Sequence, residues 1–556
     1  MSWPTIPLLS TPLFRPRHAD IPLSESVSLT YQRTKAIVQA YGLTEDDVRE
    51  TSPKFWFMHT DPIWTLDGGA GTLTTIQVNL CAGTLAMFSE GNPKAAEELR
   101  RVLRFDVVGQ FCLTEAGHGL DVIHMETTAT LLSDGSFDLH TPTEAAAKFM
   151  PPTAPAGVPC ISVVFARTIC DGEDRGVKPF LVPINDGIHM HPGVVCKLLP
   201  QRGSGFPVNH SLTYFDHVRL PSSALLGPIE RPADPRTTFF ANIFRVAVGT
   251  IAIGSQGMSA LQMGAYIAAK YSARRTVISS SGERVPILEF RTQKIPILTA
   301  LAQAHVMVAL HHRIIEIFAL PGLSNHIRHG IGSILKVVMM NHSRGALMEL
   351  SERMGAQGLF EFNQISSMHS DLRGAAIAEG DCLVVSIRLA TELLLGRYSM
   401  MPSSDPDSLL ARHEIGRFAQ CRALLKNMRG HRDPDFDRLI LPQALSLVES
   451  IGHRIAYDAA VDAGLDQCII DTYVASCIKL DPVWYSENAG LSQAEQRDME
   501  ARAIDAMYPR MWELLSATGV EPYIMAPAAS EEKWARFRDS LVTFHGAMDT
   551  QFMARL

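Results

Sequence analysis

The chain has 556 residues and a net charge of −8 at pH 7, with 50 Lys and Arg against 58 Asp and Glu. This mild acidity argues against nonspecific nucleic-acid binding, which needs clustered positive charge. Hydrophobic residues make up 46% and charged residues 19% of the chain, a balance typical of a compact globular protein and not of a disordered one. At this length we expect roughly three to four structural units.

Nine cysteines are scattered along the chain without a C-x-x-C pair. An odd, sparse set in so long a chain is typical of reduced intracellular thiols, so we expect neither a disulfide framework nor a metal site. Residues 1–4, M-S-W-P, lack the basic and apolar regions of a signal peptide. The cytoplasm is therefore the expected location unless another targeting signal is present.

The first two predicted domains differ in their hydrophobic period. Residues 1–105 are predicted to be mainly helical, with a helix start at Asn92 and Pro93, a capping side chain followed by a first-turn proline. Over residues 106–227, short β-rich runs alternate with Gly, Pro and Asp turns. This pattern predicts a central β domain. The predicted strands are residues 107–113, 127–132, 160–167, 177–182 and 211–215.

Helical periodicity returns near residue 239, and residues 228–400 are predicted to form a helical bundle. Residues 246–269 carry no charge and are long enough to cross a bilayer. Their Gly, Ser, Thr and Gln side chains favour a helix buried among other helices, so we expect no membrane span. The polar, proline-bearing segment 400–407 breaks this periodicity. Residues 401–556 are predicted to be a helical extension, with one capping box at Ser492 and Glu495. The predicted fold class is mainly α, with a central β-barrel domain.

Several common catalytic motifs are absent from the sequence. No G-x-G-x-x-G follows a predicted strand, which argues against a Rossmann dinucleotide site. No Walker A sequence or G-x-S-x-G elbow is present, and His413-Glu414 lacks the second histidine of a zinc-protease helix. Phosphotransferase, serine-hydrolase and metallohydrolase functions therefore lose most of their support.

One segment does carry a recognisable pattern. Residues 114–119 read T-E-A-G-H-G, and residues 126–130 read E-T-T-A-T. From the residues alone, this is either a glycine-bearing turn that meets an extended ligand or an ordinary β-turn. The segment resembles the signature of the acyl-CoA oxidase and acyl-CoA dehydrogenase superfamily, closer to the peroxisomal oxidase branch. The resemblance implies that Thr114, Gly117 and Gly119 lie at the isoalloxazine of FAD.

A second pair of segments extends the resemblance. Residues 271–275 read Y-S-A-R-R and are followed, after a glycine-bearing loop, by I-L-E-F-R-T-Q at 287–293. On the residues alone this is a solvated basic helix end or a phosphate site, because the guanidinium fork suits phosphate oxygens. The resemblance implies that Arg275 contacts the FAD pyrophosphate of a neighbouring subunit in a homodimer. A glutamine is usual where Arg291 stands, and Gln293 keeps an amide nearby.

The third match carries the chemistry. Residues 353–358, R-M-G-A-Q-G, and 378–381, A-E-G-D, resemble the family's glycine turn and its catalytic tetrad. The resemblance implies that Glu379 removes the pro-R α-proton of an acyl thioester while a hydride leaves the β-carbon. It also implies that Gly355 and Gly358 lie near FAD.

The tetrad residues have both a functional and a purely structural interpretation. Proton abstraction needs a carboxylate whose pKa is raised by an apolar pocket. The small, apolar flanks of Glu379, residues 374–378 and 383–385, favour such a pocket over a solvated helix shoulder. The resemblance implies that Asp381 contacts FAD, and we expect Arg245 and Gly380 in the substrate site.

The sequence departs from the family pattern at several positions. Phe149 replaces the tryptophan that packs on the flavin, although we keep it in the expected cofactor site. Together the departures suggest a divergent branch with a specialised thioester substrate, or a catalytically silent homologue. The other departures are Leu120, Pro151, Pro152, Ala356, Cys382 and Arg388.

The predicted function is FAD-dependent α,β-dehydrogenation of an acyl-CoA to the trans-2-enoyl-CoA, with O2 reoxidising the flavin and releasing H2O2. The glycine-histidine-glycine turn, the loop at 277–288 and the C-terminal extension favour an oxidase. The last three residues, Ala554-Arg555-Leu556, fit a peroxisomal address. The alternatives are a dehydrogenase that passes electrons to an electron-transfer flavoprotein, a flavin oxidase or desaturase of a specialised acyl or polyketide thioester, and a flavin-free, non-catalytic homologue.

Overall fold

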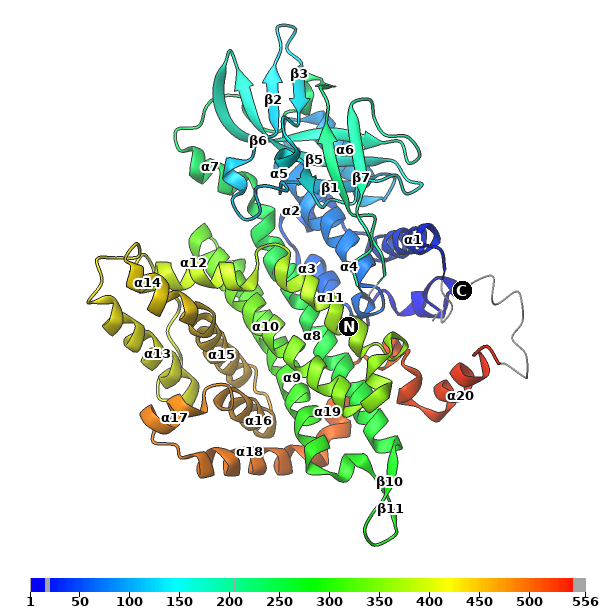
Figure 1. Cartoon of the computed structure of the whole chain (residues 1–556), viewed down its shortest axis with the longest axis vertical. Helices are drawn as coiled ribbons and strands as arrows, with labels where there is room; N and C mark the ends of the chain where they lie inside the picture. The colour runs from blue at the N-terminus through cyan, green and yellow to red at the C-terminus, as the bar shows by residue number, and fades with distance from the viewer. Residues whose placement is uncertain (1, 16–20, 204–205, 544–556) are drawn as a thin grey trace.

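Short helices build the N-terminal part of the protein in the computed structural model (Figure 1), which describes residues 2–15, 21–203 and 206–543. The Asn92 side chain accepts a hydrogen bond from the Ala95 amide at 3.1 Å, so the predicted helix start is confirmed. A π-helix, Thr75–Ala82, interrupts this region. The α-helices are α1 (Leu23–Tyr41), α2 (Glu45–Arg49), α3 (Pro53–His59), α4 (Gly68–Thr74), α5 (Gly83–Met87) and α6 (Pro93–Leu103).

The β domain follows directly and contains a six-stranded and a three-stranded sheet. The long strand β5 pairs in parallel with β1 and β2 and antiparallel with β6; β3 and β9 continue the larger sheet beyond β2. The smaller sheet has the order β4-β8-β7. The strands are β1 (Val108–Cys112), β2 (Thr128–Leu131), β3 (Phe137–His140), β4 (Lys148–Phe149), β5 (Cys160–Cys170), β6 (Glu173–Asn185), β7 (Val194–Leu198), β8 (Ser211–Phe215) and β9 (Val218–Leu220).

Each of the five predicted strands is present, and the run at 211–215 coincides with β8. Four further strands, β3, β4, β7 and β9, are two to five residues long and were not predicted. Their side chains alternate between buried and exposed, or are largely exposed, so no run of apolar residues marks them. Strand β3 pairs with its neighbour β2, and β7 pairs with the next strand, β8. Strands β4 and β9 pair with strands far along the chain, and in all four the pairing decides the conformation.

Long helices form the bundle beneath the β domain (Figure 1). Residues 246–269 lie within α8, where most side chains from Val248 to Ser272 are buried, as the sequence predicts. By length and composition α9 could cross a membrane, as could α7 with α8 taken together, but 72% of the apolar window of α9 is buried inside the protein. The helices are α7 (Pro235–Asn242), α8 (Phe244–Arg274), α9 (Arg291–Phe318), α10 (Asn325–Arg353), α11 (Ile365–Ile377) and α12 (Cys382–Leu394).

The last part of the described chain is also helical and packs against one side of the bundle, with α15 on α9, α10 and α12 (Figure 1). The predicted capping box at Ser492 and Glu495 is present at the start of α18. The helices are α13 (Leu409–Leu425), α14 (Pro434–Leu439), α15 (Ala444–Asp462), α16 (Gln467–Ile478), α17 (Pro482–Asn488), α18 (Gln493–Met507), α19 (Met511–Ala517) and α20 (Glu531–Asp539). Ala554, Arg555 and Leu556 lie outside the described residues.

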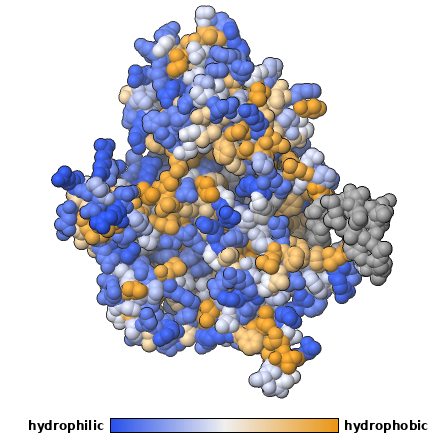
Figure 2. All heavy atoms as spheres, viewed as in Figure 1, coloured by the Kyte–Doolittle hydropathy of each residue, from blue (hydrophilic) through white to orange (hydrophobic). Residues whose placement is uncertain are grey.

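A small hairpin projects from the far end of the bundle. Its strands, β10 (Thr276–Ile278) and β11 (Arg284–Pro286), pair only with each other. Figure 1 shows the hairpin extending beyond the body of the protein, and Figure 2 shows apolar side chains on it. Ile278 is 60% exposed. Apolar side chains on a projecting element are typical of a surface that contacts another protein.

Candidate active site

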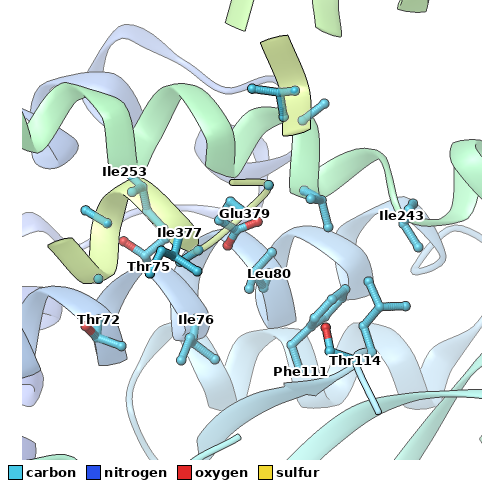
Figure 3. Close-up of a pocket in the computed structure, with 18 of the residues that line it drawn as sticks. Thr72, Thr75, Ile76, Leu80, Phe111, Thr114, Ile243, Ile253, Ile377 and Glu379 are labelled. Atoms are coloured by element: carbon cyan, nitrogen blue, oxygen red, sulfur yellow. The ribbon is translucent and has the colours of Figure 1, made fainter. Parts of the chain in front are cut away.

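A cavity of about 1040 Å³ lies where the N-terminal helices, the β domain and the bundle meet. Its walls are mostly apolar. The π-helix contributes Thr75, Ile76 and Leu80, strand β1 contributes Phe111, and Glu379 lies between α11 and α12 (Figure 3). Ligand sites commonly combine such an apolar lining with a few polar groups.

Glu379 lies on the short turn that joins α11 to α12 and has a φ of +58°. This left-handed conformation is uncommon for a residue other than glycine. The Thr250 hydroxyl donates to the Glu379 carbonyl at 2.9 Å and helps to hold the turn. The carboxyl group packs on α8 at Gly249, where an added Cβ would lie 2.6 Å from Cδ of Glu379. Gly249 therefore makes the space that the carboxyl group occupies.

Burial raises the pKa of Glu379 to about 8, against the opposing effect of the positive charges on Lys336 and Arg245. Lys336 of α10 is fully buried, and its ammonium donates to the Ala378 carbonyl and, at 2.6 Å, to the Gly380 carbonyl. The ammonium thus holds both peptide groups that flank Glu379. A carboxyl group with a pKa near neutrality is suited to take up a proton at neutral pH.

Arg245 lies behind the cavity wall, next to Glu379. Its guanidinium donates to the carbonyls of Asn79, at 3.1 Å, and Val48, at 3.0 Å. Burial lowers the pKa of Arg245 to about 9, and the nearby Glu379 carboxylate opposes this shift. Arg245 is not among the residues that line the cavity. Its position favours an electrostatic effect on Glu379 over the substrate contact expected from the sequence.

Some residues of the T-E-A-G-H-G turn stabilise the fold, and others line the cavity. The Glu115 carboxylate is buried and accepts hydrogen bonds from the Thr127 amide and hydroxyl and, at 3.0 Å, from the Lys148 ammonium. This network fixes the turn. Thr114 and Gly119 line the cavity, and the Thr114 hydroxyl has no hydrogen-bond partner among the described residues.

The other expected site residues are spread over two regions. Phe149 and Gly380 line the cavity. The remaining six do not. They are Gly117, which packs on Ala145; Arg275, at the end of α8; Gln293, whose amide donates to the Ser272 hydroxyl and the Arg353 carbonyl; Gly355 and Gly358, in the turn after α10; and Asp381, which caps α12.

Residues 247–394 match the family model of the acyl-CoA oxidase C-alpha1 domain. The peroxisomal acyl-coenzyme A oxidase 3 of Homo sapiens is 27% identical over 349 residues, which cover 56% of this chain and 48% of the relative. Acyl-coenzyme A oxidase 3 of Arabidopsis thaliana, also named peroxisomal, is 25% identical over 55% of this chain and 48% of its own length. In sequence, the protein is similar to the acyl-CoA oxidases. It spans about half the length of the curated relatives it matches.

Solved structures of acyl-CoA oxidases share the fold of this protein. Acyl-CoA oxidase 1 from Yarrowia lipolytica has a TM-score of 0.80 at 16% identity and covers 96% of this chain and 89% of its own. Acyl-CoA oxidase-1 of Caenorhabditis elegans, described as complexed with FAD and ATP, has a TM-score of 0.70 at 16% identity over 97% and 98% of the two chains. The expected order of helical, β and helical parts is confirmed.

Two charged groups at the site, Lys336 and Asp371, were not predicted from the sequence. Lys336 stands alone in the apolar run S-I-L-K-V-V-M-M at residues 333–340, and an isolated charge in such a run was the available signal. Asp371 of α11 lines the cavity, and burial raises its pKa to about 7. No motif marks Asp371. Of the departures from the family pattern, Leu120, Pro151 and Arg388 line the cavity.

Replacing Glu115 with Ala should destabilise the β domain. The change leaves the fully buried Lys148 ammonium without its carboxylate, and breaking such a pair costs about 3–5 kcal/mol. Denaturant unfolding followed by circular dichroism measures the loss. Glu126→Ala is the control, because its carboxylate is exposed and the expected loss is much smaller. Equal losses in the two variants would contradict the structural role of Glu115.

Proposed function

We propose that the protein is an FAD-dependent acyl-CoA oxidase that introduces an α,β double bond into an acyl-CoA thioester. The observation that carries this proposal is the Glu379 carboxyl group, which faces an apolar cavity and has its pKa raised towards neutrality by burial. The T-E-A-G-H-G turn presents Thr114 to the same cavity. The proposed enzyme therefore has its base and its flavin-contacting residue on one ligand site.

The residues of the cavity fit FAD. The Thr114 hydroxyl has no partner among the described residues, and the Phe149 ring is 42% exposed in the cavity wall, where a planar ring system can pack on it. Thr114 and Phe149 would hold the isoalloxazine. A C. elegans acyl-CoA oxidase-2 structure with this fold is described as bound with FAD, ascaroside-CoA and ATP, and is 17% identical to this chain. When bound, FAD would accept a hydride from Cβ and then reduce O2 to H2O2.

The protein's own residues act on Cα of the acyl group. The Glu379 carboxylate takes the α-proton, and the Cα–H electron pair becomes the second bond between Cα and Cβ as the hydride leaves Cβ. The Glu379 amide N–H donates to no backbone acceptor among the described residues, so it can donate to the thioester oxygen as charge develops there. The apolar walls keep water from the reacting carbons.

We further propose a homodimer that completes the FAD site. Arg275 is exposed at the base of the β10–β11 hairpin, and among the described residues its guanidinium donates only to the adjacent Thr276 carbonyl. The projecting hairpin and the exposed Ile278 favour contact with a second subunit. Arg275 would then reach the FAD pyrophosphate bound by its partner.

We also propose a peroxisomal location. The human and Arabidopsis relatives are named as peroxisomal. The C-terminal tripeptide at 554–556 fits the same address.

Replacing Glu379 with Gln should abolish flavin reduction while FAD stays bound, because the amide cannot accept the α-proton. The measurement is an anaerobic titration with a panel of acyl-CoAs, followed by visible absorbance, then admission of air. We expect a rate of flavin bleaching at least about 1,000-fold below wild type. Asp371→Asn, which changes the other carboxyl group on the cavity wall, is the comparison and should still bleach.

The same titration separates the alternatives. Wild-type bleaching that reverses in air with peroxide release supports the oxidase, and bleaching that persists in air supports a dehydrogenase. A bound flavin that no acyl-CoA bleaches points to a specialised thioester. A colourless, folded protein that FAD does not reconstitute points to a non-catalytic homologue.

The rate of flavin reduction should rise with pH, with a midpoint near 8, and level off at higher pH, because the reaction needs the Glu379 carboxylate. Lys336→Met removes a positive charge that favours the carboxylate, so the midpoint should move to higher pH and the rate at pH 7 should fall. Anaerobic stopped-flow measurements across pH check both statements. A midpoint that stays or moves to lower pH in a folded Lys336→Met protein would refute the role of this charge.

Arg275→Ala should lower the FAD content of the purified protein without changing its oligomeric state, because it removes a donor to the pyrophosphate. Arg284→Ala, an exposed arginine of the same hairpin, is the matched control and should retain FAD. Flavin absorbance and light scattering report the two quantities. Normal FAD content in Arg275→Ala would argue against a cofactor site shared between subunits.

A further inference from the structure

Three helices bring two histidines and a cysteine together in the interior of the bundle. His342 of α10, His453 of α15 and Cys477 of α16 each offer one ligand atom, and these atoms all lie within 4.8 Å of one another. All three residues are buried, and the two imidazole rings lie 5.1 Å apart between centroids. The cluster shares no residue with the lining of the active-site cavity.

We propose that His342, His453 and Cys477 form a binding site for a transition-metal ion that takes nitrogen and sulfur ligands, of the class of Zn²⁺. Imidazole and thiolate are the ligands that Zn²⁺ and copper ions take in proteins. The site joins the bundle to the C-terminal helical part of the chain. It is independent of the proposed oxidase activity.

The spacing of the ligand atoms fits coordination with little movement. Around a tetrahedral Zn²⁺ with bonds of about 2.0–2.3 Å, ligand atoms lie roughly 3.3–3.7 Å apart. The atoms of the cluster lie within 4.8 Å of one another. Side-chain rotations that move these atoms by about 1 Å therefore bring them to the separation needed for coordination. The three helices need not move apart or unfold.

Unpaired polar atoms surround the cluster. The Nε2 atom of His342 and the Tyr485 hydroxyl oxygen are buried and have no hydrogen-bond partner within the described ranges, and the Tyr473 hydroxyl interacts with the Cys477 thiol. The Tyr473 ring lies 5.6 Å from the His342 ring between centroids, so its phenol is a near neighbour of the site. Buried polar groups in folded proteins are rarely left without partners. A metal ion gives His342 a partner and gives Tyr473 a candidate role as the fourth ligand or as a donor to one.

The charges near the cluster suit a divalent cation. Coordination replaces the Cys477 thiol proton with the metal and releases that proton to solvent, leaving a thiolate ligand. The Glu449 carboxylate lies one turn before His453 on α15 and accepts a hydrogen bond from the Asn341 amide at 2.7 Å, beside His342. Glu449 also interacts electrostatically with Cys477 and Tyr473. One thiolate and one carboxylate balance the two positive charges of the ion.

A second group of potential ligands lacks these properties. His140, Asp216 and His217 lie at the surface of the β domain. The His217 ring already has a partner, since its Nδ1 lies 2.8 Å from the Asp138 carboxylate. The interior cluster is therefore the one that carries the proposal.

The test is metal binding by the full-length protein. Apoprotein prepared with a chelator is reconstituted with Zn²⁺, desalted, and analysed by mass spectrometry for bound metal. We expect about one Zn²⁺ per chain in the wild type and loss of most of it in Cys477→Ser and His453→Gln. Cys468→Ser, which changes a half-buried thiol on the same helix, is the matched control and should retain the metal.

Co²⁺ reconstitution of the wild type provides a second readout that needs no variant. Thiolate-to-metal charge transfer and intense visible bands are expected for tetrahedral coordination that includes Cys477. Reconstitution with copper in parallel determines which ion the site prefers. The proposal is overturned if the wild type retains no metal, if Co²⁺ binding gives no thiolate band, or if Cys477→Ser and Cys468→Ser bind metal equally. Flavin content and activity can be normal or absent in any of these outcomes, so the result does not depend on the proposed function.

Discussion

The contact between the buried Lys336 ammonium and the carbonyls of Ala378 and Gly380 is the constraint on which the candidate active site depends. An ammonium withdrawn from water needs hydrogen-bond acceptors, and the α11–α12 turn supplies two, the carbonyls on either side of Glu379. The turn therefore takes a conformation with positive φ that few residues adopt unaided. The same ammonium lies close enough to Glu379 to limit how far burial raises its pKa. One side chain of α10 thus holds the peptide groups on both sides of Glu379 and, together with Arg245, lowers the pH at which the buried carboxyl group ionises.

A second buried charge pair, Glu115 and Lys148, holds the turn on the β-domain side of the cavity in place. Glu115 and Lys148 are both withdrawn from water, and Thr127 completes the hydrogen bonds of the carboxylate. The T-E-x-G-H-G and E-T-T-A-T patterns thus meet through Glu115 and Thr127. The resemblance implied that these segments contact the cofactor. In the structure, Glu115 and Thr127 of the two patterns instead hold the turn through buried hydrogen bonds. Thr114 is left facing the cavity because its neighbour Glu115 faces the interior.

Local signals in the sequence predicted much of the fold and part of the site. Capping residues such as Asn92 and Ser492 and the apolar run of α8 are local features, and the structure has them where they were predicted. Strands β3 and β7 carry no run of buried apolar residues, and β9 depends on β3, a partner far along the chain. Lys336 was missed for a similar reason, because its partners at 378 and 380 are near it only in the folded bundle. The resemblance led to Glu379, which spacing alone would not have identified.

The scattered histidines and cysteines show most clearly what sequence spacing cannot reveal. Without a C-x-x-C pair, the sequence predicted no metal site, yet helix packing places Cys477 beside His342 and His453. His342 lies six residues after Lys336 on α10, less than two helical turns away. A metal ion at His342 would therefore tie α15 and α16 to the same helix that positions Glu379. Because helix packing resists small displacements, the helical part of the chain beyond residue 400 then acquires a physical role, to hold α10 in the place where Lys336 can meet its two carbonyls.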